Sequence, residues 1–168
     1  MVYFSSRSPV TNAILRGHGV FNNLAVQTMA IAHRERLGLE LLKRCEYIYR
    51  NDGQCQDKGA RIGALLDAGA DLTLRDHEGP DGHTALLFLI QARQVKLALM
   101  LLEHDAPVTL LTSDGHEYIQ AAQIAMRRNS NATVDEWKLL IEEISAKATR
   151  EIQARQDREL ARTQANQE

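Results

Sequence analysis

The sequence contains one phrase twice, as "LLDAGADLTLRD" at Leu65–Asp76 and as "LLEHDAPVTLLTSD" at Leu101–Asp114. Each copy has a leucine pair, an alanine at the same distance, and then a threonine-leucine pair. An Asp-Gly turn also recurs, at Asp81-Gly82 and at Asp114-Gly115, 33 residues apart. A period in the low thirties, built from short helices and turns, is typical of a helical solenoid, whose units bury their apolar faces by stacking on one another.

The composition favours an all-α fold of one domain, or one compact repeat array with a tail. Of the 168 residues, 44% are hydrophobic and 25% are charged, which are ordinary values for a globular protein with a core. Aromatic residues make up 5%, and only three prolines and ten glycines interrupt the chain. We expect helices, because strands joined by tight turns would need more turn formers and the apolar residues are mainly Leu, Ala and Ile.

The charge and the apolar runs argue against several classes of partner. A formal net charge of -2 gives no reason to expect nucleic acid or an anionic membrane. No apolar run approaches the length that would span a bilayer, and residues 1–17 lack the basic and apolar regions of a secretory signal. Cys45 and Cys55 are too few for a disulfide scaffold and fit a reducing compartment. We therefore expect a cytoplasmic protein, or one delivered into a host cell without a classical signal peptide.

Hydrophobic periodicity predicts a series of helices with few breaks. Ser8 and Pro9 mark the start of a helix that ends at Gly17, and a register shift near Gly38 separates two more helices. Five further helical stretches follow: "KGARIGALLDAG" (58–69), "TALLFLIQAR" (84–93), "VKLALMLLEHD" (95–105), "YIQAAQIAMRR" (118–128) and the stretch from Val134. The last stretch has an apolar stripe of Trp137, Leu140, Ile141, Ile144, Ala148 and Ile152. Beyond this stripe the chain is charged, and fraying or disorder is expected.

The stretch "DGHTALLFLIQARQVKLALMLLEHDAPVT", Asp81 to Thr109, resembles one full repeat of the ankyrin-repeat family. The match includes the Asp-Gly turn, Thr84-Ala85-Leu86 at the start of the inner helix, and Leu101-Leu102 at the end of the outer helix. "ARIGALLDAGADLTLRD" (60–76) resembles the second half of a preceding repeat, and "DGHEYIQAAQIAMRRN" (114–129) resembles the first half of a following one.

The resemblance covers roughly Leu39 to Ile144 and implies a short ankyrin-like helical solenoid. The chain would then divide into an N-terminal helical cap (1–38), ankyrin-like repeats (39–145) and a charged C-terminal helical tail (146–168) that is partly disordered. The repeats are degenerate. The Thr-Pro-Leu-His opening, whose polar side chains tie neighbouring repeats in that family, is replaced by Thr84-Ala85-Leu86-Leu87 and by Glu117-Tyr118-Ile119-Gln120. Asp105 stands where a glycine normally closes the outer helix, so a left-handed aspartate or an altered cap is required.

The sequence has no motif that indicates an enzyme, and we expect no cofactor. The glycines form no phosphate-binding loop, and no Gly-x-Ser-x-Gly stretch marks a nucleophile. The richest polar cluster is "RDHEGPDGH" at 75–83, in which imidazoles and carboxylates could bind a divalent metal. A solvated polar turn is the favoured interpretation, because metal sites usually need rigid, convergent ligands. A metal-binding or enzymatic role of the His77–His83 loop is kept as an alternative.

The resemblance implies a non-enzymatic module that binds a protein partner on a concave face. Carried over position by position, the contact residues are Asp81, His83, Gln91, Asp114, His116 and Ile124, with Ala92 and Ala125 beside them. The aspartates would suit a partner with a basic patch. The favoured interpretation of His83 and His116 is that each caps or decorates its turn, and contact with a partner is the alternative. We expect neither to have a structural role that a serine could not fill. An effector or an inhibitor/immunity protein of bacterial or viral origin would fit this architecture, by fold-level analogy alone.

A second function follows from the length of the C-terminal helix. Its stripe continues to Ile152, further than two short repeats would cover, so a homodimer or another partner could bury the remainder. In this alternative the protein is a scaffold that self-associates through the helix from Val134 onward.

Overall fold

The computed structural model describes residues 19–51, 58–77, 82–110, 115–128 and 132–165. Within these residues it contains six α-helices and no strand, only an isolated bridge between Arg75 and Thr84, so the predicted all-α fold is confirmed. The helices are α2 (Gly19–Arg50), α3 (Lys58–Asp67), α4 (Ala85–Gln91), α5 (Val95–Glu103), α6 (His116–Arg127) and α7 (Val134–Ala165). The helix predicted to start at Ser8 lies outside the described residues.

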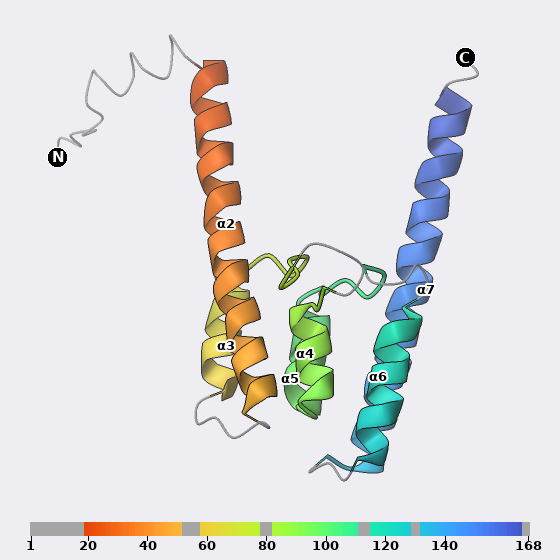
Figure 1. Ribbon diagram of the computed structural model, residues 1–168. Helices are drawn as coiled ribbons and strands as arrows, with labels where there is room; N and C mark the ends of the chain where they lie inside the picture. Colours follow the sequence, from red (N-terminus) through yellow and green to blue (C-terminus); the bar gives the residue numbers. More distant parts are fainter. Residues whose placement is uncertain (1–18, 52–57, 78–81, 111–114, 129–131, 166–168) are drawn as a thin grey trace, which may run out of the picture.

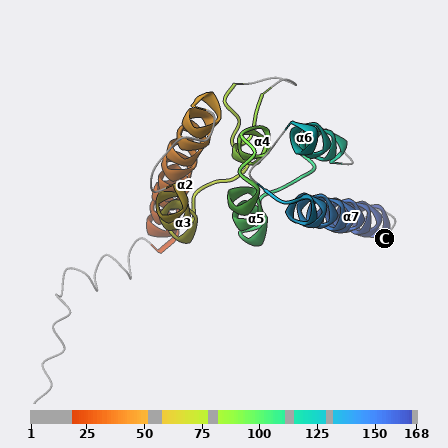
Figure 2. The ribbon, with the colours of Figure 1, turned by 90° about the horizontal axis from the view of Figure 1, so that it is seen from below.

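The helices form two rows. Helices that follow one another in the chain pack as pairs, α2 with α3, α4 with α5 and α6 with α7. One row consists of α2, α4 and α6, and the other of α3, α5 and α7 (Figure 2). We call residues 68–84 loop A and residues 104–115 loop B. The described parts of both loops (68–77, 82–84, 104–110 and 115) lie at the end of the molecule past which α2 and α7 extend (Figure 1). The first row therefore offers a face of its own, away from the second row.

The core lies between the rows and is centred on α4. All residues from Ala85 to Ile90 are buried, because this short helix has α2 and α6 on its two sides and α5 behind it. A helix that is apolar on all sides is expected at such a central position. Leu86 and Leu101, both predicted core residues, are 2% and 0% exposed. Trp137 of α7 is 1% exposed, as predicted for the residue that fixes the last helix to the stack.

The repeated phrase makes the same helix end twice. Gly69 (φ 81°) and Asp105 (φ 65°) are both left-handed, and the next amide donates back to the carbonyl of Leu65 or Leu101, at 3.1 and 2.9 Å. This pattern is the Schellman motif, in which carbonyl oxygens of the last helical turn that lack a donor within the helix accept hydrogen bonds from the following residues. Asp105 is therefore the left-handed aspartate that the sequence requires. Lys147 of α7 donates to Asp105 Oδ1 at 2.9 Å, and this hydrogen bond lowers the pKa of the carboxyl.

The predicted helix boundary near Gly38 is wrong, because α2 continues from Gly19 to Arg50. Gly38 instead allows a close approach of loop A. A Cβ there would lie 2.5 Å from the carbonyl oxygen of Asp71 and 2.8 Å from Leu74 Cδ1. The Asp71 amide donates to the carbonyl of Arg34 at 3.1 Å, which fixes the loop on the helix. The proposed division between residues 38 and 39 therefore falls inside one helix.

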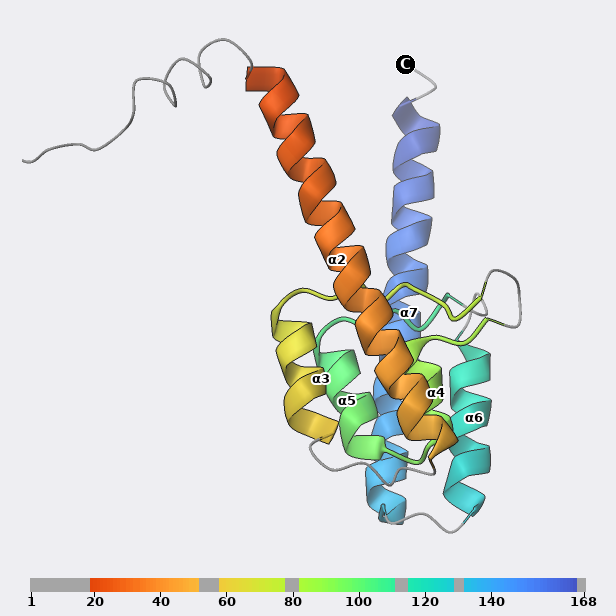
Figure 3. The same ribbon diagram turned by 60° about the vertical axis from the view of Figure 1, so that its left-hand side comes forward.

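Helix α7 includes most of the predicted C-terminal helical tail. Thr133 and Glu136 form a reciprocal capping box at its start, with Thr133 N to Glu136 Oε2 at 2.8 Å and Glu136 N to Thr133 Oγ1 at 3.2 Å. The helix continues to Ala165, so the expected disorder of the tail is not found as far as that residue. The side chains from Gln153 to Ala165 are exposed, and α7 and α2 extend well beyond the shorter helices (Figure 3).

Candidate binding site

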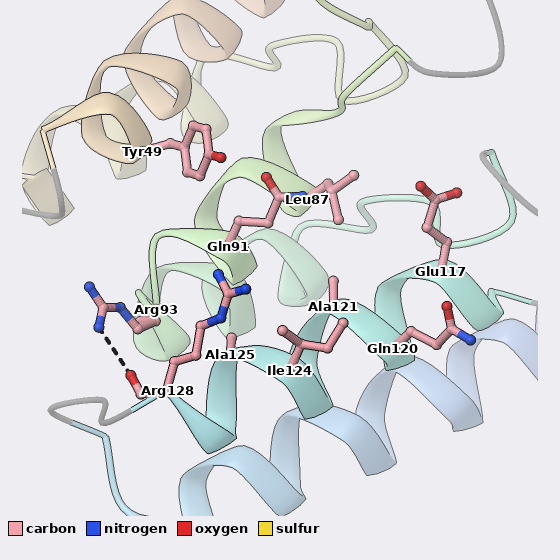
Figure 4. A pocket seen from close by; sticks show the side chains of 10 residues that line it. All are labelled: Tyr49, Leu87, Gln91, Arg93, Glu117, Gln120, Ala121, Ile124, Ala125 and Arg128. Atoms are coloured by element: carbon pink, nitrogen blue, oxygen red, sulfur yellow. Dashed lines mark hydrogen bonds between the residues drawn. The ribbon is translucent and has the colours of Figure 1, made fainter.

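A cavity of about 520 Å³ opens on the face formed by α2, α4 and α6. We call it the α4–α6 groove, because most of its lining comes from these two helices (Figure 4). The lining residues are Tyr49, Leu87, Gln91, Arg93, Glu117, Gln120, Ala121, Ile124, Ala125 and Arg128. Volumes of this size are common for ligand sites, which usually combine apolar walls with a few polar groups.

The helical repeat explains which residues of α4 and α6 line the groove. Residues three and four positions apart share one face of a helix. On α6 this face runs from Glu117 to Ala125 and is continued by Arg128, the residue that follows the helix, while the opposite side places Tyr118 and Ala122 in the core. On α4 the lining consists of Leu87 and Gln91, one turn apart. Alanines at positions 121 and 125 leave the space open, because their side chains end at Cβ.

Tyr49 of α2 forms the third wall, and two further rings hold it there. Its ring packs on Phe88 of α4, with centroids 5.6 Å apart and planes at 37°. Phe88 in turn stacks on His83 of loop A, at 5.2 Å and 16°. Phe88 is 4% exposed and Tyr49 is 42% exposed. A rigid aromatic side chain with an open face is the type of residue that interfaces favour.

Gln91 has the most unusual hydrogen bonding in the groove. Its Oε1 atom is buried and has no hydrogen-bond partner among the described residues. A buried acceptor without a donor costs free energy, since most such groups in proteins are paired. On the facing side of the groove, Ile124 leaves 51% of its surface exposed.

The charged residues separate toward the two ends of the groove. Arg93 and Arg128 lie at one end, and Glu117 lies at the other (Figure 4). Arg93 follows α4 in a left-handed conformation with φ 59°, and its Nη1 donates to the carbonyl of Arg128 at 3.1 Å. Nothing in the described part of the chain forms an ion pair with the Arg128 guanidinium, which extends into the groove in Figure 4.

The residues predicted to contact a partner divide into three groups. Gln91 and Ile124 line the groove together. His83 and His116 do not line it, and Asp81 and Asp114 lie outside the described residues. Ala92 was expected at the surface but is 3% exposed, because its amide closes the last turn of α4 on the Phe88 carbonyl. Ala125 is 4% exposed and forms part of the floor.

The expectation that His83 has no structural role is wrong. Its ring stacks on Phe88, and its amide donates to Asp76 Oδ1 at 2.7 Å. His116 is exposed at the first turn of α6, with its Nε2 2.7 Å from Gln120 Nε2.

One carboxylate contacts both histidines of the predicted polar loop, His77 and His83. Asp76 Oδ1 lies 2.7 Å from His77 Nδ1, and Asp76 Oδ2 lies 3.9 Å from His83 Nδ1. Among the described residues no group of three or more His, Cys, Asp or Glu side chains is arranged to hold a metal ion. Cys45 is buried in α2, and burial raises the pKa of its thiol to about 12, so the thiolate needed for nucleophilic chemistry does not form at neutral pH.

Sequence reasoning missed several lining residues. Gln120, Ala121 and Arg128 stand three or four positions from Ile124 in the sequence. The helical period was therefore a signal from which they could have been predicted. Tyr49 and Arg93 gave no such signal, because their place depends on how α2 and α4 pack.

The chain gives no match to any protein-family model, to any curated protein or to any solved structure with which it was compared. In the part of the chain that the structure describes, no helix has both the length and the apolar character to cross a membrane.

Proposed function

We propose that this protein is a non-enzymatic interaction module that binds a protein partner in the α4–α6 groove. The observation that carries the proposal is the buried, unpartnered Oε1 of Gln91, a residue that lines this open cavity. An unsatisfied buried acceptor destabilises the free protein, and a hydrogen-bond donor from a partner would satisfy it. A role of Gln91 in binding would explain why the protein keeps an acceptor that lowers its folding stability.

The neighbouring side chains support the same proposal. Ile124 and Tyr49 expose apolar surface on opposite sides of Gln91, and both belong to helices. An apolar anchor near the centre, surrounded by polar groups, is the usual composition of a protein interface.

We also propose that the arrangement of the helices is ankyrin-like. The two rows of antiparallel pairs, the loops at one end and the duplicated Schellman motif support this proposal. In such a stack the row of α2, α4 and α6 would be the inner, ligand-binding row. The role of an effector or an immunity protein stays a prediction.

Self-association through the helix from Val134 onward has less support. Beyond Ile152 the only large apolar side chain of α7 in the described residues is Leu160, which is 62% exposed. A single leucine does not make an apolar stripe that a second copy would need to cover.

The test is affinity capture with the full chain and two matched variants. Ile124→Asp places a charge in the groove, whereas Gln123→Asp places the same charge on an exposed neighbouring position outside it. Both changes should leave the free energy of unfolding within about 0.5 kcal/mol, because both positions are exposed. A partner held by the wild type and by Gln123→Asp, but lost by Ile124→Asp, would support the groove. Equal capture by all three proteins would place binding elsewhere, and light scattering that shows a dimer would favour self-association.

A further inference from the structure

We infer that the α4–α6 groove binds an acidic peptide segment, in which a carboxylate stands near an aliphatic or aromatic side chain. This inference rests on the proposed function and specifies the chemistry of the partner. It reverses the charge expected from the sequence. That expectation relied on Asp81 and Asp114, which lie outside the described residues, whereas the groove itself carries two arginines at one end.

The arginine end of the groove is suited to a carboxylate. The side chain of Arg93 is anchored through Nη1 on the Arg128 carbonyl, which keeps the two residues together. Among the described residues no carboxylate pairs with the Arg128 guanidinium, and Glu117, the acidic residue of the lining, lies at the far end of the groove (Figure 4). A carboxylate fits because a guanidinium can donate two parallel hydrogen bonds to its oxygens.

The middle of the groove is suited to an apolar side chain next to a peptide backbone. Ile124, which is half exposed in the free protein, and Ala121 provide apolar contact, and the buried Leu87 lies behind them. The unpartnered Oε1 of Gln91 accepts but cannot donate, so it matches a backbone N–H of the ligand. Both needs are met by one amino acid residue whose side chain covers Ile124 while its amide faces Gln91.

The length of the groove favours a peptide over a single small molecule. Glu117 and Arg128 are both on the groove face near the two ends of α6, and a helix rises about 1.5 Å per residue, so they are about 16 Å apart along the axis. An extended chain rises about 3.3 Å per residue, so about five residues would span this distance. We expect the ligand to place its acidic residue toward Arg93 and Arg128, and to avoid acidic residues at the end near Glu117.

The experiment selects a phage-displayed library of random 12-residue peptides on the immobilised full chain. Enriched peptides are then synthesised with a fluorescent label, and their binding to wild type and variants is measured by anisotropy. We expect sequences with Asp or Glu within a few residues of Leu, Ile, Phe or Trp. Arg128→Glu should weaken their binding by about tenfold or more, as roughly expected for a charge-assisted hydrogen bond. Arg127→Glu is the matched control, because Arg127 is the preceding, exposed residue of α6 and does not line the groove. It should change binding by less than about threefold.

A charge exchange makes the test specific for the acidic group. Replacing the acidic residue of the peptide by lysine should abolish binding to the wild type and restore part of it to Arg128→Glu. Gln91→Met keeps the volume of the side chain but removes the acceptor, so it should weaken peptide binding without lowering the melting temperature.

The outcomes separate the two proposals. Two results would overturn the inferred chemistry but leave the groove as the site, provided that Ile124→Asp no longer binds the peptides. One is that the selected peptides are basic, and the other is that they bind Arg128→Glu as well as wild type. Peptides that bind Ile124→Asp unchanged, or a selection without enrichment, would overturn both.

Discussion

The hydroxyl groups of Thr84 and Tyr118 form a buried hydrogen bond of 3.0 Å that joins the start of α4 to the first turn of α6. Thr84 Oγ1 also accepts from the amide of Leu87 at 3.2 Å and so caps α4. The threonine and the tyrosine thus tie the central helix pair to the following one.

Removing the hydroxyl of Tyr118 should therefore destabilise the fold. Tyr118→Phe leaves a ring of the same shape but deprives Thr84 of its partner, and we expect a loss of about 1–2 kcal/mol in the free energy of unfolding. The measurement is urea unfolding. Tyr47→Phe is the control, since Tyr47 is 57% exposed, and it should change stability by less than about 0.5 kcal/mol. Equal effects of the two changes would contradict the role of the buried pair.

Glu151 of α7 should hold loop B in place. Its carboxylate accepts from the amides of Val108 and Thr109 and from Thr109 Oγ1, at 3.2, 3.0 and 2.7 Å. Glu151→Ala should cost about 1.5–3 kcal/mol, as for hydrogen bonds to a charged group. It should also speed hydrogen exchange at the amides of Val108 and Thr109. Glu143→Ala removes a carboxylate from an exposed position on the same helix and should leave both amides protected.

Leu101 should carry a large share of the core stability. It is fully buried in α5, so Leu101→Ala should cost about 2–5 kcal/mol through lost apolar contact and the cavity left behind. Leu139→Ala is the matched change on the surface, where the side chain is 47% exposed, and it should cost much less. An unchanged urea midpoint for Leu101→Ala would show that the core is packed differently.

Two glycines inside helices should respond to alanine with opposite signs. Gly63→Ala in α3 meets only Met100 Sδ, at 4.0 Å, and should stabilise by about 0.5–1 kcal/mol through helix propensity. Gly38→Ala brings Cβ to 2.5 Å from a backbone oxygen of loop A. The steric clash outweighs the gain in helix propensity, so we expect a net loss of about 1–3 kcal/mol in the free energy of unfolding. Thermal unfolding of both variants checks the signs. A stabilised Gly38→Ala protein would mean that loop A does not rest on α2.

Stability should fall at alkaline pH because of two buried acids. Burial raises the pKa of Cys45 from 9.0 to about 12 and that of Tyr118 from 10.0 to about 12. The unfolded chain thus loses these protons at a lower pH than the folded chain. The associated stability is fully present below about pH 9 and is lost as the pH rises toward 12, by up to about 1.4 kcal/mol per pH unit for each group. Urea unfolding between pH 7 and 11 should show a shallower decline for the Cys45→Ala, Tyr118→Phe double variant. The same slope as in wild type would contradict this assignment.

The helix ends and the core stripes were predictable because their signals are local. Gly69 and Asp105 close their helices through hydrogen bonds to residues a few positions back, so the repeated phrase was sufficient to identify both ends. Leu86, Leu101 and Trp137 followed from apolar residues at helical spacing, which indicates the face a helix must bury. The wrong boundary at Gly38 also came from a local signal. The sequence shows a glycine that weakens a helix, but only the approach of Asp71 and Leu74 explains why the helix continues through it.

The binding groove was decided by the tertiary structure. Gln91 and Ile124 could be named from the sequence as residues on the inner faces of their helices. Tyr49 joins them because α2 packs beside α4, and its ring is set by Phe88 and His83, which lie far from it in the sequence. Whether the Oε1 of Gln91 has a partner depends on every group that packs around it, and no periodicity encodes such an absence. The sequence determines which side each helix buries, because that depends on neighbours within a turn or two. Which polar and charged groups then meet across the remaining surface depends on the packing of segments that are distant in the chain.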